Sequence, residues 1–148
     1  MVSLFLRSSV LVLLDQLSKT AVRRSFLPGQ SRAVWPGVFY LSYVQNPGAA
    51  FGLLRNQTWL LVIVTLAVVA LIILFAGRVN FQTPLPGWSL SLVLGGAVGN
   101  LIDRLRFGYV VDFLDFRVWP VFNVADMAIV VGVGLLMIYL LGSEGKLL

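Results

Sequence analysis

The 148-residue chain contains no cysteine and no histidine. These absences exclude thiol nucleophiles, disulfides, histidine general bases and zinc sites built on His or Cys ligands. Polar chemistry must therefore come from Asp, Glu, Lys, Arg, Ser, Thr, Asn or Tyr side chains. Charge is scarce as well, because 11% of the residues are charged and 59% are hydrophobic, whereas a soluble domain is about 25% charged. We therefore expect a membrane protein.

The net charge of +5 raises the alternative of a nucleic-acid-binding protein. The basic residues are scattered along the chain, however, and the apolar excess dominates. We therefore expect no nucleic acid as a partner, and we expect membrane lipids with anionic headgroups to supply the counter-charge.

Four apolar segments approach the length of about 20 residues that crosses the hydrocarbon core of a bilayer. The first could pass for a signal peptide, but Asp15, Gln16 and Lys19 interrupt it and no small-residue cleavage pattern follows, so we expect a retained span. Four spans would place both termini on one side of the membrane, in a single domain covering residues 1–148. The expected spans are residues 3–22, 59–76, 88–105 and 124–141.

The distribution of basic residues gives a weak orientation. Arg7, Arg78 and Lys146 lie on the side of the termini, whereas most of the other basic residues lie on the opposite side. Taken literally, the positive-inside rule would place the long loops in the cytoplasm. Several of these residues are at helix ends or in a candidate site, which weakens the rule here.

The connection between the first two apolar segments is too long for a simple turn. Residues 35–45, WPGVFYLSYVQ, are rich in aromatic and β-branched side chains after Pro36-Gly37, which predicts short strands. Asn46-Pro47-Gly48 follows as a turn. We expect a small β element over residues 30–52, lying on the membrane surface.

The stretch from Phe107 to Asp126 joins the last two apolar segments and holds three of the six acidic residues, Asp112, Asp115 and Asp126. Carboxylates beside membrane-length apolar sequence are costly to bury, so they are candidates for function. A structural alternative for Asp126 is compensation of a helix dipole, with Asn123 as the N-cap. The alternative for Asp112 is a solvated loop, which its valine and phenylalanine neighbours disfavour.

If Asp112 and Asp126 meet in a medium of low dielectric, they cannot both ionise easily. One pKa then rises, and at neutral pH one carboxyl serves as an acid and the other as a base. Water attack on a peptide carbonyl requires that pair of roles. Asp115 is the internal competitor. It follows Asp112 by three residues, so it could share a face with Asp112 in a helix but would point away from it in a strand.

Two further polar groups interrupt apolar segments. Asp15 and Lys19 share a helix face and can pair, either to neutralise the first span or to support a site. Asn100, Asp103 and Arg104 lie on one face of the third segment, after Gly95 and Gly99, whose spacing favours close helix packing. They either belong to a site or include a snorkelling end-cap, which would explain Arg104 alone but explains Asn100 and Asp103 less well. A serine–lysine hydrolase built on Ser18 and Lys19 is disfavoured, because adjacent helical residues point in different directions.

The sequence resembles the lipoprotein signal peptidase family, also called signal peptidase II. The resemblance rests on five motifs in family order across essentially the whole chain. These motifs are Asp15-Gln16-Leu17-Ser18-Lys19, Asn46-Pro47-Gly48-Ala49-Ala50-Phe51-Gly52, Gly99-Asn100-Leu101-Ile102-Asp103-Arg104, Val110-Val111-Asp112-Phe113 and Phe122-Asn123-Val124-Ala125-Asp126.

The resemblance implies a bacterial aspartic peptidase of the inner membrane with a catalytic dyad of Asp112 and Asp126. It also implies an all-α membrane fold of four transmembrane helices with a small β-cradle, cytoplasmic termini and an active site near the periplasmic face. Asp115 lies in a stretch that the family leaves variable. The positions that would line or support the site are Asp15, Lys19, Asn46, Asn100, Asp103, Arg104 and Asn123.

The implied reaction is hydrolysis of a prolipoprotein before a diacylglyceryl-modified cysteine, which releases the signal peptide. The resemblance implies no metal or organic cofactor, a monomer, and inhibition by globomycin-type cyclic peptides. The alternative class is a small non-enzymatic membrane protein, either an ion or proton pathway component or an assembly subunit. It is disfavoured because the acids cluster at one membrane face and no polar ladder crosses the second span.

Overall fold

The computed structural model describes residues 1–48, 54, 56–77 and 84–144 of the chain. Its described residues form four long helices and one three-stranded sheet, so the chain is mostly helical with a small β element, as predicted. In chain order the elements are α1 (Val2–Ser25), β1 (Ser31–Trp35), β2 (Phe39–Asn46), α2 (Thr58–Ala76), α3 (Pro84–Phe107), β3 (Val110–Asp115) and α4 (Val124–Glu144).

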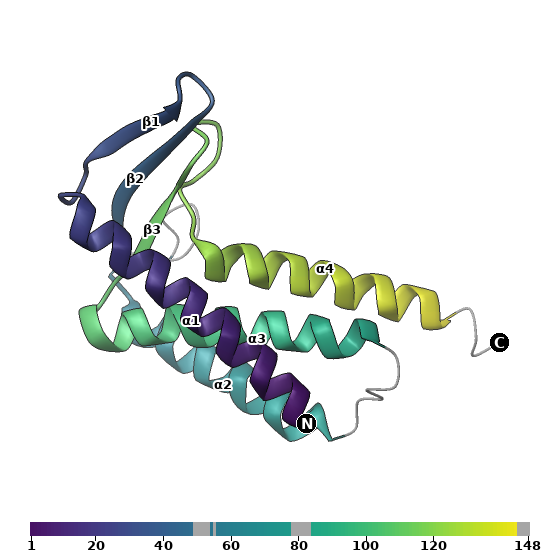
Figure 1. Cartoon of the computed structure of the whole chain (residues 1–148). Helices are drawn as coiled ribbons and strands as arrows, with labels where there is room; N and C mark the ends of the chain where they lie inside the picture. Colours follow the sequence, from purple (N-terminus) through teal and green to yellow (C-terminus); the bar gives the residue numbers. More distant parts are fainter. Residues whose placement is uncertain (49–53, 55, 78–83, 145–148) are drawn as a thin grey trace.

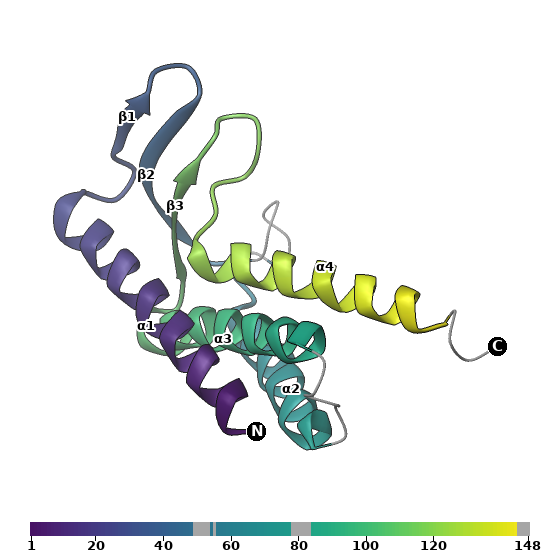
Figure 2. The same ribbon diagram turned by 45° about the vertical axis from the view of Figure 1, so that its right-hand side comes forward.

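Helix α3 is the central helix and packs against α1, α2 and α4 (Figures 1 and 2). Small residues permit this packing. A Cβ at Gly95 would lie 2.8 Å from Cδ2 of Leu11 on α1, and a Cβ at Gly96 would collide with the carbonyl oxygen of Ala125 on α4. The close approach that the glycine spacing predicted is therefore present on two sides of α3.

The sheet has the order β1-β2-β3 with antiparallel neighbours, and it projects from one end of the helices (Figures 1 and 2). Helix α1 begins, and helix α4 ends, away from the sheet (Figure 1). The strands were predicted to follow Pro36-Gly37, but these residues form the turn of the hairpin and β1 precedes them. Gly37 supplies the positive φ of +79° that this turn needs.

Helices occupy each of the four predicted apolar segments. The third begins at Pro84 rather than near residue 88, because proline is well tolerated in the first helical turn, where backbone N–H groups have no intrahelical partner. The predicted connection over residues 77–87 is therefore shorter than expected. Of the predicted β element over residues 30–52, residues 49–52 lie outside the described part of the chain.

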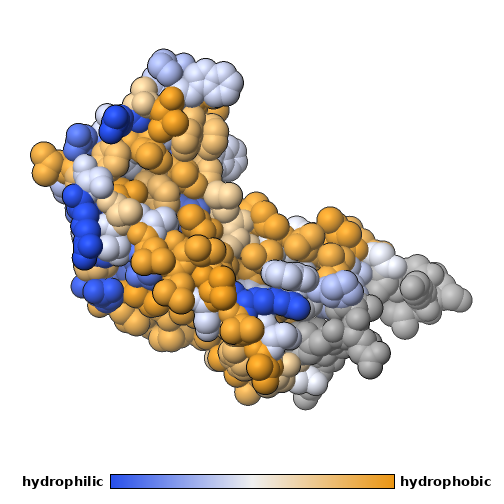
Figure 3. Space-filling view, in the orientation of Figure 1, coloured by the Kyte–Doolittle hydropathy of each residue, from blue (hydrophilic) through white to orange (hydrophobic). Residues whose placement is uncertain are grey.

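Among the described residues, three helices are long and apolar enough to cross a membrane: Thr58–Ala76, Pro84–Phe107 and Val124–Gly142. Apolar side chains cover most of one face of the helical body, whereas most of the hydrophilic side chains on this face gather near the end of α1 and the sheet (Figure 3). Helix α1 carries Asp15, Lys19 and several arginines, so its crossing of the membrane stays a prediction.

Candidate active site

Asp112 lies in the middle of β3, and only 2% of its surface is exposed. The amide groups of two asparagines donate to its carboxylate. Asn46 Nδ2 is 2.9 Å from Oδ2, and Asn123 Nδ2 is 2.7 Å from Oδ1. The carboxyl group therefore sits in a buried setting of neutral donors.

Asp126 lies in the first turn of α4. The Asp126 backbone N–H donates to Asn123 Oδ1 at 2.9 Å, and the Asn123 backbone N–H donates to Asp126 Oδ2 at 3.3 Å. This reciprocal pair is a capping box with Asp in the third helical position. Asn123 is therefore the N-cap, as predicted, and the cap fixes the Asp126 side chain.

Two asparagine side chains connect the acids. Asn123 Nδ2 donates to Asp112 and also to Asn100 Oδ1 at 3.2 Å, while Asn100 Nδ2 donates to Asp126 Oδ1 at 2.7 Å. Asp112 and Asp126, which are fourteen residues apart in the sequence, thus meet through one continuous set of hydrogen bonds. The structure brings the two predicted acids together.

Burial, followed by the nearby negative charge of Asp126, raises the pKa of Asp112 from 3.8 to about 7, against smaller lowering by the amides of Asn46 and Asn123. Removal from water disfavours the charged form of a carboxyl group, and a second carboxylate adds repulsion. At neutral pH, Asp112 can therefore both hold and release a proton.

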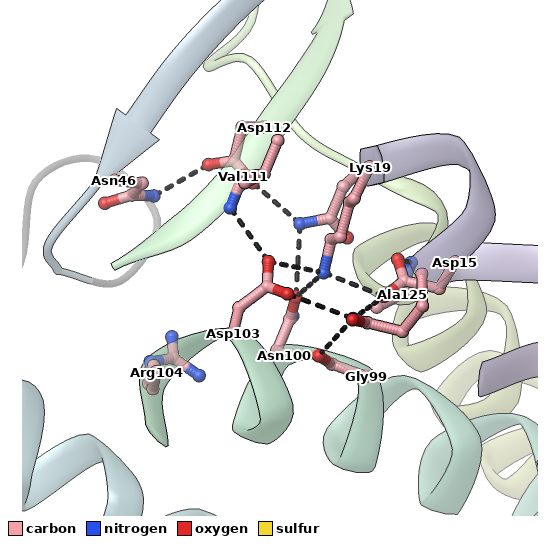
Figure 4. Close-up of polar contacts among 12 residues, drawn as sticks. Asp15, Lys19, Asn46, Gly99, Asn100, Asp103, Arg104, Val111, Asp112 and Ala125 are labelled. Carbon is pink, nitrogen blue, oxygen red and sulfur yellow. Dashed lines mark hydrogen bonds and ion pairs between the residues drawn. The ribbon is translucent and has the colours of Figure 1, made fainter. Parts of the chain in front are cut away.

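Behind the acids, Lys19 is almost completely buried and uses its ammonium group three times (Figure 4). It forms ion pairs with Asp15 at 2.8 Å and with Asp103 at 3.2 Å, and it donates to Asn100 Oδ1 at 2.9 Å. Because Lys19 occupies the oxygen of Asn100, the amide nitrogen of Asn100 faces Asp126. The predicted Asp15–Lys19 pair thus also reaches the site.

Asp15 and Asp103 tie separate elements together. Asp15 Oδ1 accepts from the backbone N–H of Ala125 in the first turn of α4, and Asp103 Oδ2 accepts from the backbone N–H of Val111 in β3, each at 3.0 Å. The neighbours of Asp126 and Asp112 are therefore both anchored to this buried network. Gly99 is part of it, because a Cβ there would lie 2.6 Å from Asp15 Oδ2.

Gln16 is a residue of the network that was not proposed from the sequence. Its Nε2 lies 3.0 Å from Asp103 Oδ1, 3.1 Å from the Gly99 carbonyl oxygen and 3.2 Å from Asp15 Oδ2. It lies inside the motif that carried the family resemblance. A polar amide within an apolar helix was the sequence feature that could have identified it.

A cavity of about 1040 Å³ opens beside the two acids. Arg104 lines it and reaches the Gly48 carbonyl oxygen with Nη2 at 3.4 Å. Five polar or charged residues line the cavity, and the remaining lining is mostly apolar. The polar lining residues are Asn46, Asn100, Arg104, Asp112 and Asp126.

The geometry does not favour the two competing assignments, Asp115 as a member of the acid pair and Ser18 with Lys19 as a serine–lysine hydrolase. Asp115 contacts Ser42 and Arg117 rather than the other two acids, because residues three apart in a strand face opposite sides. The Ser18 hydroxyl donates to the Asp15 carbonyl oxygen of its own helix at 2.8 Å, and Lys19 is engaged in ion pairs. Within the described ranges, no cluster of three or more His, Cys, Asp or Glu side chains could hold a metal ion.

The family model for signal peptidase (SPase) II matches residues 8–142. The chain belongs to the signal peptidase II family. It is 58% identical to the lipoprotein signal peptidase of Moorella thermoacetica over 96% of this chain and 97% of that protein. The corresponding enzyme of Pelotomaculum thermopropionicum is 49% identical, over 97% of this chain and 94% of that protein.

Two solved structures of bacterial membrane enzymes share the fold. One superposes with a TM-score of 0.92 at 29% identity, covering 99% of this chain and 92% of the other. The second has a TM-score of 0.86 at 30% identity, covering 95% and 94%. The chain is thus a bacterial membrane peptidase, and the non-enzymatic alternative is not favoured.

Proposed function

We propose that this signal peptidase II family member is an aspartic endopeptidase that removes signal peptides from prolipoproteins, cutting before a diacylglyceryl-modified cysteine. The observation that carries the proposal is that Asp112 and Asp126 line one cavity, where burial and the charge of Asp126 raise the pKa of Asp112 to about 7. The names of the similar proteins from Moorella and Pelotomaculum support the substrate class.

The two acids divide the work of hydrolysis. Asp112 enters the reaction protonated and donates a hydrogen bond to the scissile carbonyl oxygen. Asp126, at a helix N-terminus that favours negative charge, takes a proton from water as the water oxygen attacks the carbonyl carbon. As the tetrahedral intermediate collapses, the C–N bond breaks, the leaving amine nitrogen receives the proton from Asp126, and Asp112 keeps its own proton.

The supporting residues hold this arrangement before substrate arrives. Asn100 and Asn123 fix the two carboxyl groups, and Lys19 with Asp15 and Asp103 fixes Asn100 and the ends of β3 and α4. Asn46 and Arg104 line the cavity, where they would position the substrate backbone. Preorganised polar groups of this kind lower the reorganisation needed in the transition state.

The proposal includes the location of the enzyme in the cell and its orientation in the membrane. The whole chain is one inner-membrane domain with four spans, because α1 buries the charges of Asp15 and Lys19 against α3 rather than exposing them to lipid. The sheet and the site face the extracytoplasmic side, and both termini are cytoplasmic, which is supported by α1 beginning and α4 ending away from the sheet (Figure 1). The enzyme acts as a monomer, and globomycin-type peptides occupy the cavity.

A cleavage assay tests the proposal. Purified protein in detergent is incubated with a diacylglyceryl-modified prolipoprotein, and signal-peptide loss is followed as a gel shift. We expect cleavage by the wild type and a loss of about a hundred- to ten-thousandfold in Asp112→Asn and Asp126→Asn, because each removes one proton-transfer group. Cleavage that survives in either folded variant contradicts the dyad, and a wild type that cleaves neither lipidated nor unlipidated substrate contradicts the function.

A further inference from the structure

Two arginines from different helices lie against one aromatic ring where α3 ends. The Cζ of Arg23, in the last turn of α1, is 4.2 Å from the ring centroid of Phe107, the last residue of α3. The Cζ of Arg106, in the last turn of α3, is 5.1 Å from the same centroid. We call Arg23 and Arg106 the arginine pair. Neither of them lines the cavity beside Asp112 and Asp126, so the pair belongs to a different part of the molecule.

The protein does not balance the charges of the arginine pair. Among the described residues, ion pairs engage only the cations of Lys19 and Arg117. Arg23 donates from Nη2 to the neutral hydroxyl of Thr20 at 3.1 Å, and its Nε is buried with no acceptor in the described part of the chain. The hydrogen-bonding capacity of the Arg23 guanidinium is therefore only partly used, although charged donors form the stronger hydrogen bonds.

The dipoles of the two helices explain part of this arrangement. Basic residues are favourable in the last turn of a helix, and both arginines occupy such a turn. The dipoles do not require the two side chains to approach one ring, because each could extend into solvent from its own helix. Their distances from the Phe107 centroid keep the two Cζ atoms within about 9 Å of each other, where like charges repel and a shared anion is favoured.

The arginine pair lies at the level where a membrane meets water. Helix α3 is long and apolar enough to cross a membrane, and Phe107 is its last residue. The Phe107 ring stacks on that of Tyr109 with the centroids 5.8 Å apart, and the Tyr109 hydroxyl accepts a hydrogen bond from Gln45 at 2.9 Å. Tyrosines are enriched at membrane–water interfaces, and hydrophilic side chains gather near this end of α1 (Figure 3). The pair is therefore at the depth of lipid headgroups.

We propose that the arginine pair binds the phosphate of an anionic phospholipid in the leaflet at this end of α3. A guanidinium that stacks on an aromatic face still presents its N–H edge, and that edge matches two phosphate oxygens. One phosphate that accepts N–H···O bonds of about 2.8 Å from each arginine can bridge two guanidinium groups at such a separation. The bound lipid joins α1 to α3 in addition to the contacts with Phe107.

Exposed leucines distinguish a lipid from a soluble phosphate as the ligand. Leu17 on α1 and Leu105 on α3 expose 62% and 65% of their surfaces, and both precede the arginines in their helices. Acyl chains attached to a bound headgroup would cover these side chains, whereas a soluble anion would leave them exposed. A zwitterionic headgroup is less suitable, because its ammonium group adds a positive charge beside the two guanidinium groups.

Thermal unfolding in neutral detergent micelles, followed by tryptophan fluorescence, tests the site without a cleavage assay. A lipid that binds only the native state raises Tm. We expect phosphatidylglycerol to raise the Tm of the wild type about 4 °C more than phosphatidylcholine does at the same mole fraction. The double variant Arg23→Gln with Arg106→Gln should lose this difference, because its neutral amides do not attract the phosphate charge.

A matched double variant controls for net charge. Arg7→Gln with Arg32→Gln removes the same two charges from other places, since Arg7 lies over the ring of Trp88 at 4.2 Å and Arg32 is an exposed residue of β1. This variant should keep the preference for phosphatidylglycerol. Equal loss of the preference in both double variants would overturn the inference, as would equal Tm rises with the two lipids in the wild type. A rise of the same size with inorganic phosphate at equal concentration would assign the pair to a soluble anion and overturn it too.

Phe107→Leu keeps both charges and an apolar contact, so it tests the site even if the glutamine variant fails to fold. It removes the ring that places the two guanidinium groups side by side. In native mass spectra we expect the wild type to retain phosphatidylglycerol about tenfold more than phosphatidylcholine, and Phe107→Leu to lower this ratio to about twofold. An unchanged ratio in Phe107→Leu would contradict a site built on one ring.

Discussion

Asp112 and Asp115 lie three residues apart on β3, are both buried, and have opposite surroundings. Asp112 receives hydrogen bonds from two neutral amides and lies near a second carboxylate, so its pKa rises to about 7. Asp115 has a hydroxyl donor and an arginine partner. Neighbours rather than residue type therefore set the two roles: Asp112 can exchange a proton near neutral pH, and Asp115 holds Ser42 and Arg117.

The largest expected change in stability concerns Lys19, which forms ion pairs with two buried carboxylates, those of Asp15 and Asp103. Lys19→Met removes the partner of Asp15 and Asp103 while keeping a long side chain. We expect the free energy of unfolding to fall by about 3–5 kcal/mol, because an uncompensated buried charge remains. Denaturant unfolding in detergent measures this change.

The double variant Asp15→Asn with Lys19→Met is the control for Lys19. It removes one of the two orphaned charges and should recover part of the lost stability. If the single variant unfolds like the wild type, the network does not hold the bundle together, and the anchoring of β3 and α4 through Asp103 and Asp15 is wrong.

A cation placed beside Asp112 would make its surroundings similar to those of Asp115, which already has an arginine partner. Asn46→Lys gives Asp112 a partner like that of Asp115, so the pKa of Asp112 should fall and the protonated form should be lost at lower pH. We expect kcat near neutral pH to drop about ten- to a hundredfold, with the alkaline limb of the pH–rate profile displaced to lower pH.

Asn46→Ala is the matched variant of opposite sign. It removes a hydrogen bond that stabilises the ionised form of Asp112, so the pKa should rise and the alkaline limb should move to higher pH. Displacement of both variants in the same direction would show that Asn46 does not act through the charge of Asp112.

The pH dependence of stability sharpens the contrast further. Because the pKa of Asp112 is 3.8 in the unfolded reference and about 7 in the folded chain, the native state binds the proton more tightly. The stability contributed by this group is complete below pH 3.8 and is lost as the pH rises to about 7, with a slope of at most about 1.4 kcal/mol per pH unit. Thermal unfolding of Asp112→Asn should lack this slope, whereas Asp115→Asn should retain it.

The smallest expected effect separates the two roles of Asn123, which caps helix α4 and donates a hydrogen bond to Asp112. Serine keeps a cap for α4 but cannot donate the amide hydrogen bond to Asp112, so Asn123→Ser should lower kcat about tenfold while stability is nearly kept. Asn123→Ala should lower kcat similarly and also destabilise the protein by about 1 kcal/mol. Paired kinetics and unfolding measurements check this, and full activity of Asn123→Ser would contradict the assignment.

The helices and the grouping of site residues were accessible from the sequence for physical reasons. Long apolar segments specify helices in lipid, and polar residues within them must find partners inside the protein. Asp15, Lys19, Asn100 and Asp103 accordingly form one network. The family motifs added the pairing of Asp112 with Asp126, which residue spacing alone left open.

The polar cluster of Ser31, Ser42, Asp115 and Arg117 was not predicted, because it depends on tertiary contacts. Ser31 and Ser42 face each other only through the register of β1 and β2, and Asp115 reaches Ser42 only through the pairing of β2 with β3. The bond from Asp15 to the Ala125 N–H is similar, since it joins residues 110 positions apart. Such contacts follow from the packed fold and leave no local pattern in the sequence.

An infrared titration of the protonated carboxyl band tests the central claim most directly. We predict a band that disappears between roughly pH 6 and pH 8 in the wild type and in Asp115→Asn, and that is absent over this range in Asp112→Asn. A titrating band that persists in Asp112→Asn, or one that is lost only in Asp115→Asn, would contradict the assignment of Asp112 as the carboxyl group that holds the proton.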